Sequence, residues 1–451
     1  MQKQNKNPDQ LPLRELDLVI DSMAFGGKGV ARHDGKVFFV EDGIEGDVAT
    51  VEVTEETDRY NEARVIILKT PSPHRGPSPC PVSDRCGGCQ WQGVPYAQQI
   101  SWKKQFVVNA LSRIGKLGES IEVETIPSPA VNSYRNRIFV RARIHPDGRL
   151  AVGYFRRGSR DFVEVSRCAI AVDRLNDFIT RLENVSFKEH LELRDVKTEI
   201  KFRFEMQDIP ARATTEPHIL LSVYDPDDST FPVDVIVKSL AAVQGVAWAG
   251  GPLDLPNAPF VEFETDLGVT FHTSAGLFQQ VNIPDNHIVR RLVKEAVDEF
   301  KPPRILDLFC GSGNLSLPLA DGTRSVDGIE FSKRSIMTAN HNVASGKIPN
   351  ANYTAGDTEK FLWRAAKSNE RYDMVIADPP RAGMFKSLSP LVKLKPRHII
   401  YVSCDPTTLS RDLSSLVKFG FEVKRFVALD FFPNTYHIES FVILERIPGH
   451  D

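Results

Sequence analysis

Cys404 is the residue of this chain whose type and position most favour chemistry. It follows an apolar run, His398 to Ser403, that predicts a buried strand, and Asp405-Pro406-Thr407 after it predicts a break and the start of a helix. A thiolate at a strand end is a nucleophile that a substrate can reach. The positive end of the following helix dipole is expected to lower the pKa of this thiol. The sequence therefore predicts covalent catalysis by Cys404.

A second set of residues has the spacing of a nucleotide site. A predicted strand ends in the segment from Asp307 to Asn314, whose Gly311 and Gly313 let the backbone approach a ligand closely. The next predicted strand ends at Glu330, where an acid commonly binds ribose hydroxyls. A dinucleotide dehydrogenase is one alternative, but the loop lacks the third glycine of that fingerprint. A class I methyltransferase that uses S-adenosylmethionine fits better, because later strands also end in polar residues.

The expected pocket for that donor draws on several strand ends. Glu330 is expected to hold the ribose, Asp357 to reach the adenine, and Phe309 with Asn314 to line the pocket. A further strand ends at Asp378-Pro-Pro-Arg381, and ligands of open sheets gather at such ends. Amino-group methyltransferases also carry Asp-Pro-Pro, but an aromatic residue follows their prolines, whereas an arginine follows here. The sequence therefore argues against methylation of an amino group.

A pyrimidine base connects a nucleophilic cysteine with a methyl donor. Addition of a thiolate to C6 makes C5 enolate-like, so that C5 can attack the methyl group. The C5 proton must then leave before the thiol is expelled, which requires a general base. Glu439 is the candidate base and Cys404 the candidate nucleophile. A pyrimidine that belongs to a folded nucleic acid must also leave its stack to reach both groups.

Four further cysteines predict a metal site. Cys80, Cys86 and Cys89 form a Cys-x5-Cys-x2-Cys cluster, and Cys168 is available as a fourth thiolate. Tetrahedral zinc and a [4Fe-4S] cluster both accept four thiolates, so the spacing leaves both open. Methyl transfer needs no electron transfer, so we expect a structural or RNA-positioning role rather than a redox role. Cys310, beside the glycine loop, is expected to be a packed small residue.

An arginine-rich segment predicts a surface for nucleic acid. From Arg135 to Arg167 arginines alternate with aromatic residues, and the odd-numbered arginines from Arg135 to Arg143 would share one face of a strand. Guanidinium groups bind phosphates, and aromatic rings stack on bases. The net charge of the whole chain is -3, so any attraction to nucleic acid must come from such a local surface.

The elements that position these residues fall into three regions. The chain has 451 residues, more than one hydrophobic core usually organises. Short strands and glycine-rich turns predict a small β-barrel over 11–70, and the proline-rich segment 71–79 predicts a linker. An α+β region with a helix over 96–116 extends to about residue 280. Over 281–451, strands alternate with helices, one of them after the glycine loop, which predicts a doubly wound, mainly parallel sheet. The strands expected there are 304–309, 325–330, 374–377, 398–402 and two near Phe426 and Phe441.

Composition and the N-terminus indicate neither a membrane protein nor a secreted one. The chain is 41% hydrophobic and 25% charged, as in ordinary globular proteins. It contains no run of the roughly 20 apolar residues that a transmembrane helix needs. The first residues lack the apolar core of a signal peptide. We therefore expect a cytoplasmic protein with no membrane partner, acting as a monomer.

At these residues the chain resembles the RNA uracil-5 methyltransferase family, over nearly its whole length. Gly26 to Arg32 is similar to the signature turn of the family's TRAM barrel, and Cys86-Gly-Gly-Cys89 to its cysteine cluster. Tyr134 to Arg137 is similar to a central-domain motif, and Phe278 to Asn282 to the segment before the catalytic domain. The resemblance implies a TRAM domain (11–70), a central RNA-binding domain with an iron-sulfur cluster (71–280) and a methyltransferase domain (281–451).

The resemblance also implies roles for single residues. It makes Cys404 the nucleophile and Glu439 the base, and it implies that Asp378 faces the target uracil. The implied donor contacts are Gln280, Phe309, Asn314, Glu330, Asp357 and Asp378. It favours a [4Fe-4S] cluster over zinc on Cys80, Cys86, Cys89 and Cys168. Two positions depart from the family: Asp405 stands where asparagine is common, and Arg137 where lysine is.

The implied product is 5-methyluridine, with S-adenosylmethionine as donor and 23S ribosomal RNA as the favoured substrate. Transfer RNA is an alternative substrate. A catalytically idle iron-sulfur protein that only binds RNA is an alternative function.

Overall fold

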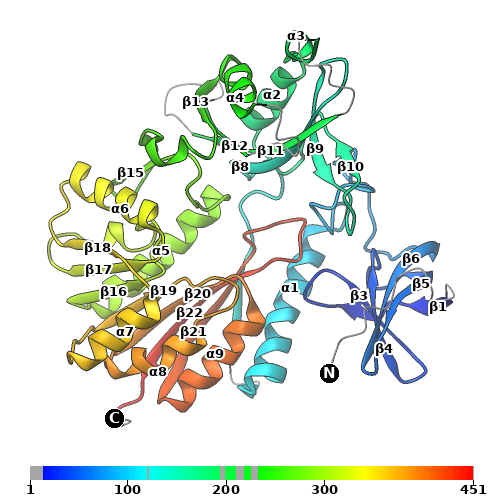
Figure 1. Ribbon diagram of the computed structural model, residues 1–451. Helices are drawn as coiled ribbons and strands as arrows, with labels where there is room; N and C mark the ends of the chain where they lie inside the picture. The colour runs from blue at the N-terminus through cyan, green and yellow to red at the C-terminus, as the bar shows by residue number, and fades with distance from the viewer. Residues whose placement is uncertain (1–13, 119–120, 193–198, 210–217, 225–231, 450–451) are drawn as a thin grey trace, which may run out of the picture.

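The computed structural model describes residues 14–118, 121–192, 199–209, 218–224 and 232–449. Residues 11–13 of the expected barrel lie outside this part of the chain. Figure 1 shows an N-terminal sheet in blue, a central sheet in green and a C-terminal layer in yellow to red. The multidomain α/β class expected from the sequence is confirmed.

The N-terminal region is a six-stranded sheet around a small apolar core. Its strands are β1 (Glu15–Val19), β2 (Ser22–Met23), β3 (Gly29–His33), β4 (Lys36–Glu41), β5 (Val48–Glu56) and β6 (Tyr60–Thr70), in the order β1-β5-β6-β4-β3-β2. Phe38, Val40 and Val51 are buried in this core. The sequence did not predict β2 or β3. β3 starts at Gly29, where a Cβ would lie 2.6 Å from Ile20, so this strand can approach its neighbours only with glycine there.

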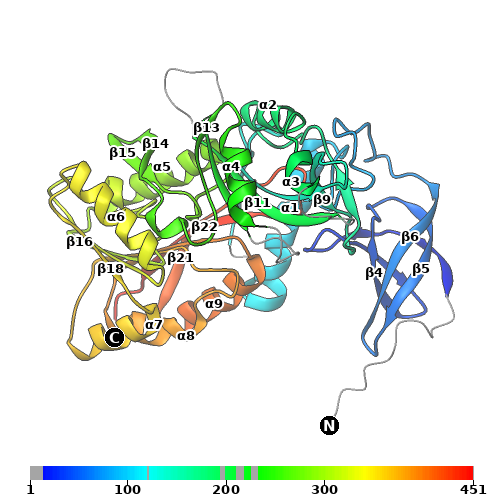
Figure 2. The same ribbon diagram turned by 45° about the horizontal axis from the view of Figure 1, so that its top comes forward.

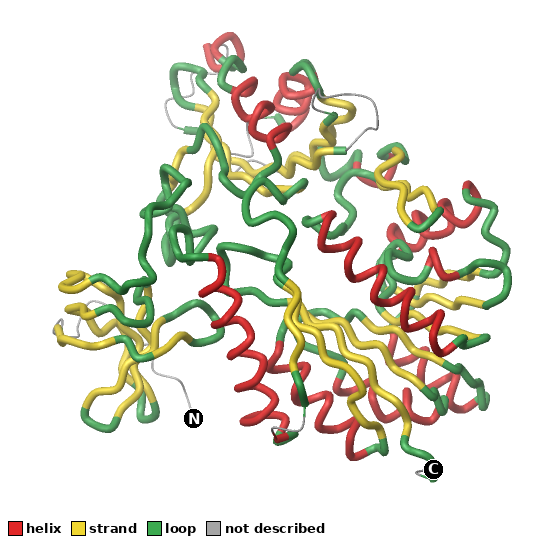
Figure 3. The backbone as a smooth tube through the Cα atoms, turned by 180° about the vertical axis from the view of Figure 1, so that it is seen from behind, coloured by secondary structure: helices red, strands yellow, loops and turns green. Residues whose placement is uncertain are grey.

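The chain between the first two sheets contributes to the C-terminal layer. The expected linker 71–79 contains no helix or strand. The expected helix forms as α1 (Tyr96–Ala110), which ends in one π-helical turn, η2 (Leu111–Gly115). β7 (Val123–Ile126) then joins the edge of the C-terminal sheet beside β21, and α1 packs against α9, as Figure 3 shows from behind. The C-terminal layer therefore includes chain from outside residues 281–451.

The central sheet is covered by helices on one face. Its strands are β8 (Arg137–Ile144), β9 (Leu150–Phe155), β10 (Phe162–Glu164), β11 (Ile200–Asp208), β12 (Ile219–Tyr224) and β13 (Val246–Gly250), in the order β10-β9-β8-β11-β12-β13. The helices are α2 (Asp173–Leu182), α3 (Lys188–Glu192) and α4 (Val233–Ala241) (Figure 2). The even-numbered residues of β8, from Ile138 to Ile144, are buried beneath them, so its odd-numbered residues occupy the opposite face. A short turn, η4 (Leu255–Asn257), and the hairpin β14 (Val261–Asp266) and β15 (Val269–Thr273) lead to the next layer.

The C-terminal layer is a doubly wound sheet, as the sequence predicts, but it has eight strands where six were expected. Its strands are β16 (Arg304–Leu308), β17 (Ser325–Glu330), β18 (Ala351–Ala355), β19 (Met374–Ala377), β20 (His398–Ser403), β21 (Phe421–Leu429) and β22 (Glu439–Arg446), with β7, in the order β18-β17-β16-β19-β20-β22-β21-β7. The strands from β18 to β20 are parallel, and β22 is antiparallel to both neighbours. The helices are α5 (Ile283–Phe300), α6 (Lys333–Ser345), α7 (Thr358–Lys367), α8 (Phe385–Lys393) and α9 (Pro406–Lys418).

Alternate strand residues build a core on each face of this sheet. Leu306 and Leu308 pack in one core with α1, α7, α8 and α9. Ile305 packs in the other with α5 and α6. The result is a three-layer sandwich whose parallel strands all end at one edge.

Two expectations about this layer are wrong. No helix follows the glycine loop: the segment forms turns and a short 3-10 helix, η5 (Leu317–Leu319), because Pro318 and the left-handed backbone at Gly311 and Gly313 prevent a longer helix. β18 and α7 were missed between β17 and β19. β18 is an edge strand with mostly exposed or half-buried residues, so its sequence lacks a buried apolar run.

Within the described residues, no helix is both long enough and apolar enough to cross a membrane.

Candidate active site

The carboxyl ends of the parallel strands open into one large cavity. Its volume is about 1430 Å³. Every residue expected to contact the donor or the target base lines it: Gln280, Phe309, Asn314, Glu330, Asp357, Asp378, Cys404 and Glu439. This convergence follows from the topology, because parallel strands end at the same edge of a sheet.

The glycine loop after β16 shapes one end of the cavity. Gly311 and Gly313 have φ values of 55° and 86°, and a Cβ on Gly313 would lie 3.0 Å from the Tyr353 hydroxyl. Only glycine suits such a backbone at this distance from its neighbour. The N–H of Gly311 donates to Glu330 Oε2 (3.3 Å), and the N–H of Ser332 donates to Oε1 (2.8 Å). The loop and the acid of β17 are therefore held together at the cavity wall.

Two residues of α5, Asn286 and Arg290, hold Asn314 at this wall; the sequence predicts the helix from His287 to Phe300 but not this role of its side chains. The side-chain amides of Asn286 and Asn314 exchange two hydrogen bonds (3.0 and 2.9 Å), and Arg290 Nη2 donates to Asn314 Oδ1 (2.7 Å). Buried Arg290 also pairs with Glu264 at 3.1 Å. Asn286 and Arg290 are one turn apart on the buried face of α5. Two polar residues one turn apart on the inward face of a helix could have identified these contacts from the sequence, because buried polar side chains need hydrogen-bond partners.

Asp357 reaches the cavity through the two elements that the sequence did not predict. It follows β18 and caps α7, where its Oδ1 accepts from the N–H of Lys360 at 2.8 Å. The cap orients the carboxylate at the cavity wall.

Cys404 and Glu439 come from neighbouring antiparallel strands. β20 pairs with β22 up to Ser403, which stands opposite Ser440. Cys404 and Glu439 are therefore one register step further along the same pair, and both line the cavity. The expected nucleophile and the expected base lie side by side.

The expectation of a lowered thiol pKa is wrong for this structure. Burial raises the pKa of Cys404 to about 11, and the neighbouring Glu439 carboxylate adds to the effect. The helix after Cys404 begins with Asp405 as its cap, and the N–H groups of Thr407 and Thr408 both donate to Asp405 Oδ1. The positive end of the helix therefore carries a carboxylate, which offsets its effect on the thiol.

Two acidic groups adjoin the thiol. Burial raises the pKa of Asp378 to about 7. Burial also raises the pKa of Glu439 well above its ordinary value, and the charge of Asp378 adds to it. A carboxylate with a raised pKa is a stronger proton acceptor once it is ionised. The pair can hold and move a proton beside Cys404.

Arg381 and His437 complete the wall near the thiol. Arg381 Nη2 lies 3.3 Å from His437 Nε2. Burial, assisted by Arg381, lowers the pKa of His437 to about 4, so its imidazole is neutral at pH 7. The ring packs against Tyr436 and Phe432, with centroids 4.1 and 5.7 Å away. A neutral imidazole can donate or accept a hydrogen bond next to the base.

The four cysteines expected to bind a metal are neighbours in space. Burial raises the pKa of Cys86 and, to about 12, that of Cys89, and nearby Cys168 adds to both. Cys80 acts on Cys86 in the same way, and all four are free thiols. In the described part of the chain, however, no three His, Cys, Asp or Glu side chains are arranged to hold a metal ion. The donor set fits four-thiolate coordination, but a formed ligand shell is not seen.

The arginine-rich segment divides into a buried and an exposed part. Arg137 is buried in an ion pair with Glu205 and donates to the Leu277 carbonyl at 2.6 Å. Arg137 therefore holds the central sheet against the cavity and is not free to bind phosphate, which corrects that expectation for this residue. Arg135 is half-buried and lines the cavity, with its guanidinium 5.8 Å from the Phe432 ring.

Arginines further along the same face remain accessible. Arg141 stands opposite Arg203 in the β8–β11 pair. Their guanidinium groups lie 4.6 Å from the Phe155 ring and 4.7 Å from the Tyr224 ring. The neighbouring Phe139 side chain is 51% exposed. This group of cations and aromatic rings is called the arginine–aromatic face below.

The fold and the cavity define a class I methyltransferase that uses S-adenosylmethionine. A glycine loop after the first parallel strand, an acid ending the next strand and a cavity at the carboxyl edge are its features. The solved structure of Pyrococcus abyssi tRNA (uracil-54, C5)-methyltransferase, in complex with S-adenosyl-L-homocysteine, has the same fold. The TM-score is 0.68, with 22% identity, over 95% of this chain and 100% of that one.

Sequence comparisons narrow the class to one family. Residues 266–447 match the tRNA (Uracil-5-)-methyltransferase model, and residues 13–66 match the TRAM domain. The 23S rRNA (uracil(1939)-C(5))-methyltransferase RlmD of Aeromonas hydrophila is 30% identical over 99% of this chain and 98% of its own. That of Methylococcus capsulatus is 31% identical over 97% and 98%. The chain belongs to the RNA uracil-5 methyltransferase family.

Proposed function

We propose that this protein transfers a methyl group from S-adenosylmethionine to C5 of a uridine in RNA and forms 5-methyluridine. The observation that carries the proposal is the register of β20 and β22, which sets Cys404 beside Glu439 in the cavity that Glu330 and Asp357 also line. A thiol next to a buried carboxyl group suits the two steps that uracil C5 methylation requires.

The donor would occupy the glycine-loop end of the cavity. Glu330 and Asp357 would hold the ribose and adenine, and Gln280, Phe309 and Asn314 would line the rest. When bound, S-adenosylmethionine supplies an electrophilic methyl group. Asp378, with a pKa near 7, can donate or accept a hydrogen bond at the uracil edge.

The chain's own groups perform the covalent and proton-transfer steps. The Cys404 thiolate forms a bond to C6, and the electron pair of the C5–C6 double bond makes C5 nucleophilic. C5 takes the methyl group as the bond between that methyl and the donor sulfur breaks, with its electron pair left on the sulfur. Glu439 then removes the proton from C5. The electrons of that C–H bond restore the double bond, and the S–C6 bond breaks to release Cys404 as thiolate.

The favoured substrate is 23S ribosomal RNA, and transfer RNA is the alternative. The full-length similarity to two RlmD proteins supports the first. The test is incubation of the protein with labelled donor and unmodified ribosomal or transfer RNA, followed by nucleoside analysis. Label in 5-methyluridine is expected, and label confined to adenine or cytosine would reject the proposed function. We also expect a cytoplasmic monomer.

The cysteines are the proposed site of a [4Fe-4S] cluster, with zinc as the alternative. Support comes from the position of Cys168, which is distant from Cys86 and Cys89 in the sequence but lies near both in space. The thiols would have to reorient to complete a ligand shell. Elemental analysis and visible absorption of protein purified without oxygen test this. Iron with sulfide is expected, and zinc alone would support the alternative. Absence of both iron and zinc would reject a metal site.

A further inference from the structure

The loop between β21 and β22, residues 430–438, brings several groups to the cavity. Phe432 and His437 line it, and Glu439 follows at the first position of β22. The loop has no regular hydrogen-bonding pattern of its own, yet most of its residues are buried. Its conformation must therefore be set by contacts with the rest of the protein.

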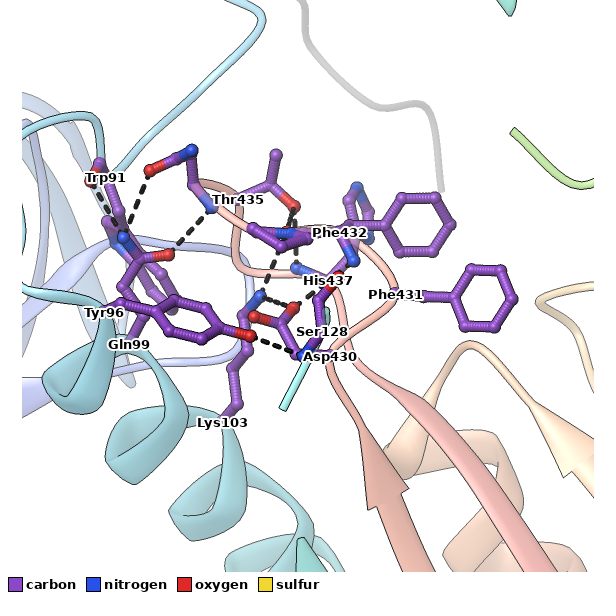
Figure 4. A network of polar contacts seen from close by, with 12 residues as sticks. Trp91, Tyr96, Gln99, Lys103, Ser128, Asp430, Phe431, Phe432, Thr435 and His437 are labelled. Atoms are coloured by element: carbon purple, nitrogen blue, oxygen red, sulfur yellow. Dashed lines mark hydrogen bonds and ion pairs between the residues drawn. The ribbon is translucent and has the colours of Figure 1, made fainter. Parts of the chain in front are cut away.

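A lysine of α1 supplies the innermost of these contacts. Lys103 and Asp430 are both fully buried, and Lys103 Nζ lies 2.5 Å from Asp430 Oδ1. The same Nζ donates to the carbonyl of Phe432 at 3.0 Å. Figure 4 shows the lysine reaching from the helix into the base of the loop. One ammonium group thus binds two points of the loop at once.

Hydrogen bonds continue from this point to His437. The Thr435 hydroxyl donates to the Phe432 carbonyl at 2.8 Å, and the N–H of His437 donates to the Thr435 hydroxyl at 3.3 Å (Figure 4). The chain of contacts therefore runs from Lys103 through Phe432 and Thr435 to a residue that lines the cavity beside Cys404.

A second residue of α1 holds the middle of the loop. Gln99 lies one helical turn before Lys103 and is also fully buried. Its Oε1 accepts from the N–H of Asn434 (2.8 Å), and its Nε2 donates to Asn434 Oδ1 (3.2 Å). Asn434 has a φ of 65°, a strained backbone that needs such support. Two points of one rigid helix thus fix the loop.

We propose that Lys103 and Gln99 are positioning residues for methyl transfer, which set loop 430–438 so that His437 and Glu439 meet a base bonded to Cys404. The proposal rests on the proposed function. A buried ion pair adds little net stability, because desolvation of both charges offsets their attraction, whereas its geometry constrains the groups that it joins. Neither residue lines the cavity, so both act through the loop.

The test is the double variant Lys103→Met and Asp430→Asn, which removes both charges of the ion pair, while the nearby buried Asp285 keeps its hydrogen bond from the Ser128 hydroxyl. With a natural uridine substrate, kcat is expected to fall about tenfold or more, because small displacements of catalytic groups are costly, while KM for the donor changes less than about twofold. Slow proton removal should let RNA bonded to Cys404 accumulate during turnover, as visible on a denaturing gel. Lys104→Met, at the adjacent exposed position of α1, is the matched control and should behave as the wild type.

The readouts separate positioning from a merely structural role. A structural role would lower the thermal unfolding temperature and the folded fraction but leave kcat per folded molecule unchanged with no trapped RNA, and that result would overturn the proposal. Gln99→Leu is the second variant and should trap RNA in the same way. Wild-type turnover of the Gln99→Leu variant would show that Gln99 is not a positioning residue. If the wild type itself makes no 5-methyluridine, the proposed function fails instead.

Discussion

Cys404 and Glu439 face each other one register step beyond the last residue pair of β20 and β22. After burial, the charge of Glu439 is the largest cause that raises the pKa of the Cys404 thiol. The charge of Glu439 therefore opposes ionisation of the nucleophile. Once the sulfur is bonded to a pyrimidine it carries no charge, so this conflict ends. Burial and Asp378 still hold the pKa of Glu439 above its ordinary value, which suits the ionised carboxylate to accept the C5 proton.

This relationship predicts opposite effects of Glu439→Gln on two rates. Removal of the neighbouring charge lowers the thiol pKa, so alkylation of Cys404 by iodoacetamide at pH 9 should become about three- to tenfold faster. Methylation should fall about a hundredfold, because the C5 proton has no acceptor, and RNA bonded to the enzyme should accumulate. Mass spectrometry of the labelled peptide and steady-state turnover measure the two effects.

Two controls accompany this variant. Cys404→Ala should abolish both the alkylated peptide and the adduct with 5-fluorouridine RNA, since a surviving adduct would mean another nucleophile. Glu445→Gln changes an acid near the other end of β22 and should leave both rates unchanged. Equal alkylation rates in Glu439→Gln and the wild type would show that the carboxylate does not act on the thiol.

A second prediction concerns the acid beneath the donor site. Asp307 is 1% exposed, and burial raises its pKa to about 8. The pKa of Asp307 is near 4 in the unfolded chain and about 8 in the folded protein. Between these pH values the unfolded chain releases the proton and the folded protein keeps it, so the stability of the wild type falls as pH rises from about 4 to about 8. Asp307→Asn should therefore gain stability relative to the wild type over that window, by about 5 kcal/mol at pH 8, since each unit of pKa shift corresponds to about 1.4 kcal/mol.

Urea unfolding from pH 5 to pH 9 measures this difference. The exposed Asp58→Asn should track the wild type throughout. A stability gap between Asp307→Asn and the wild type that does not widen with pH would show that Asp307 is ionised in the folded protein.

The site was largely predictable because it stands at strand ends. Apolar runs that finish at Glu330, Asp378 and Cys404 predict buried parallel strands, and the geometry of such sheets brings their ends together without any knowledge of loops. Glu439 was identified from the chemistry that a nucleophilic cysteine requires. No comparable rule links α1 with the loop after β21, because residues so far apart in sequence meet only through tertiary packing.

The errors have physical causes in particular residues. The dipole of α9 predicted a more acidic thiol, but Asp405 places a carboxylate at that helix end, and burial acts in the opposite direction. The alternation of arginines correctly placed Arg137 and Arg141 on one face of β8. Periodicity could not show that Glu205, on the adjacent β11, buries Arg137 and leaves Arg141 accessible.

A third prediction tests the hydrogen-bonded pair Asn286 and Asn314. Loss of the Asn286 amide removes two hydrogen bonds that hold Asn314 at the donor end of the cavity. Asn286→Ala should therefore raise KM for S-adenosylmethionine about tenfold, the effect of about 1.4 kcal/mol, with kcat within about threefold of the wild type. Isothermal titration with S-adenosylhomocysteine should show a matching loss of affinity.

Asn340→Ala, which removes an amide of α6 that donates a hydrogen bond to the Tyr353 carbonyl, is the control for this variant. An unchanged KM would remove Asn286 from donor binding.

The last prediction concerns the arginine–aromatic face as a surface for RNA. Arg141 and Arg203 are adjacent across β8 and β11, and each guanidinium lies over an aromatic ring that leaves its charge available to a phosphate. Replacement of both by glutamine should weaken RNA binding about tenfold at moderate salt and reduce the slope of log affinity against log salt by about one to two. Donor affinity should not change, because neither residue lines the cavity. Arg397→Gln with Lys418→Gln removes the same charge from exposed positions elsewhere in the catalytic layer and should leave the slope unchanged. Equal slopes for the two double variants would show that RNA does not contact this face, even if the protein methylates uridine.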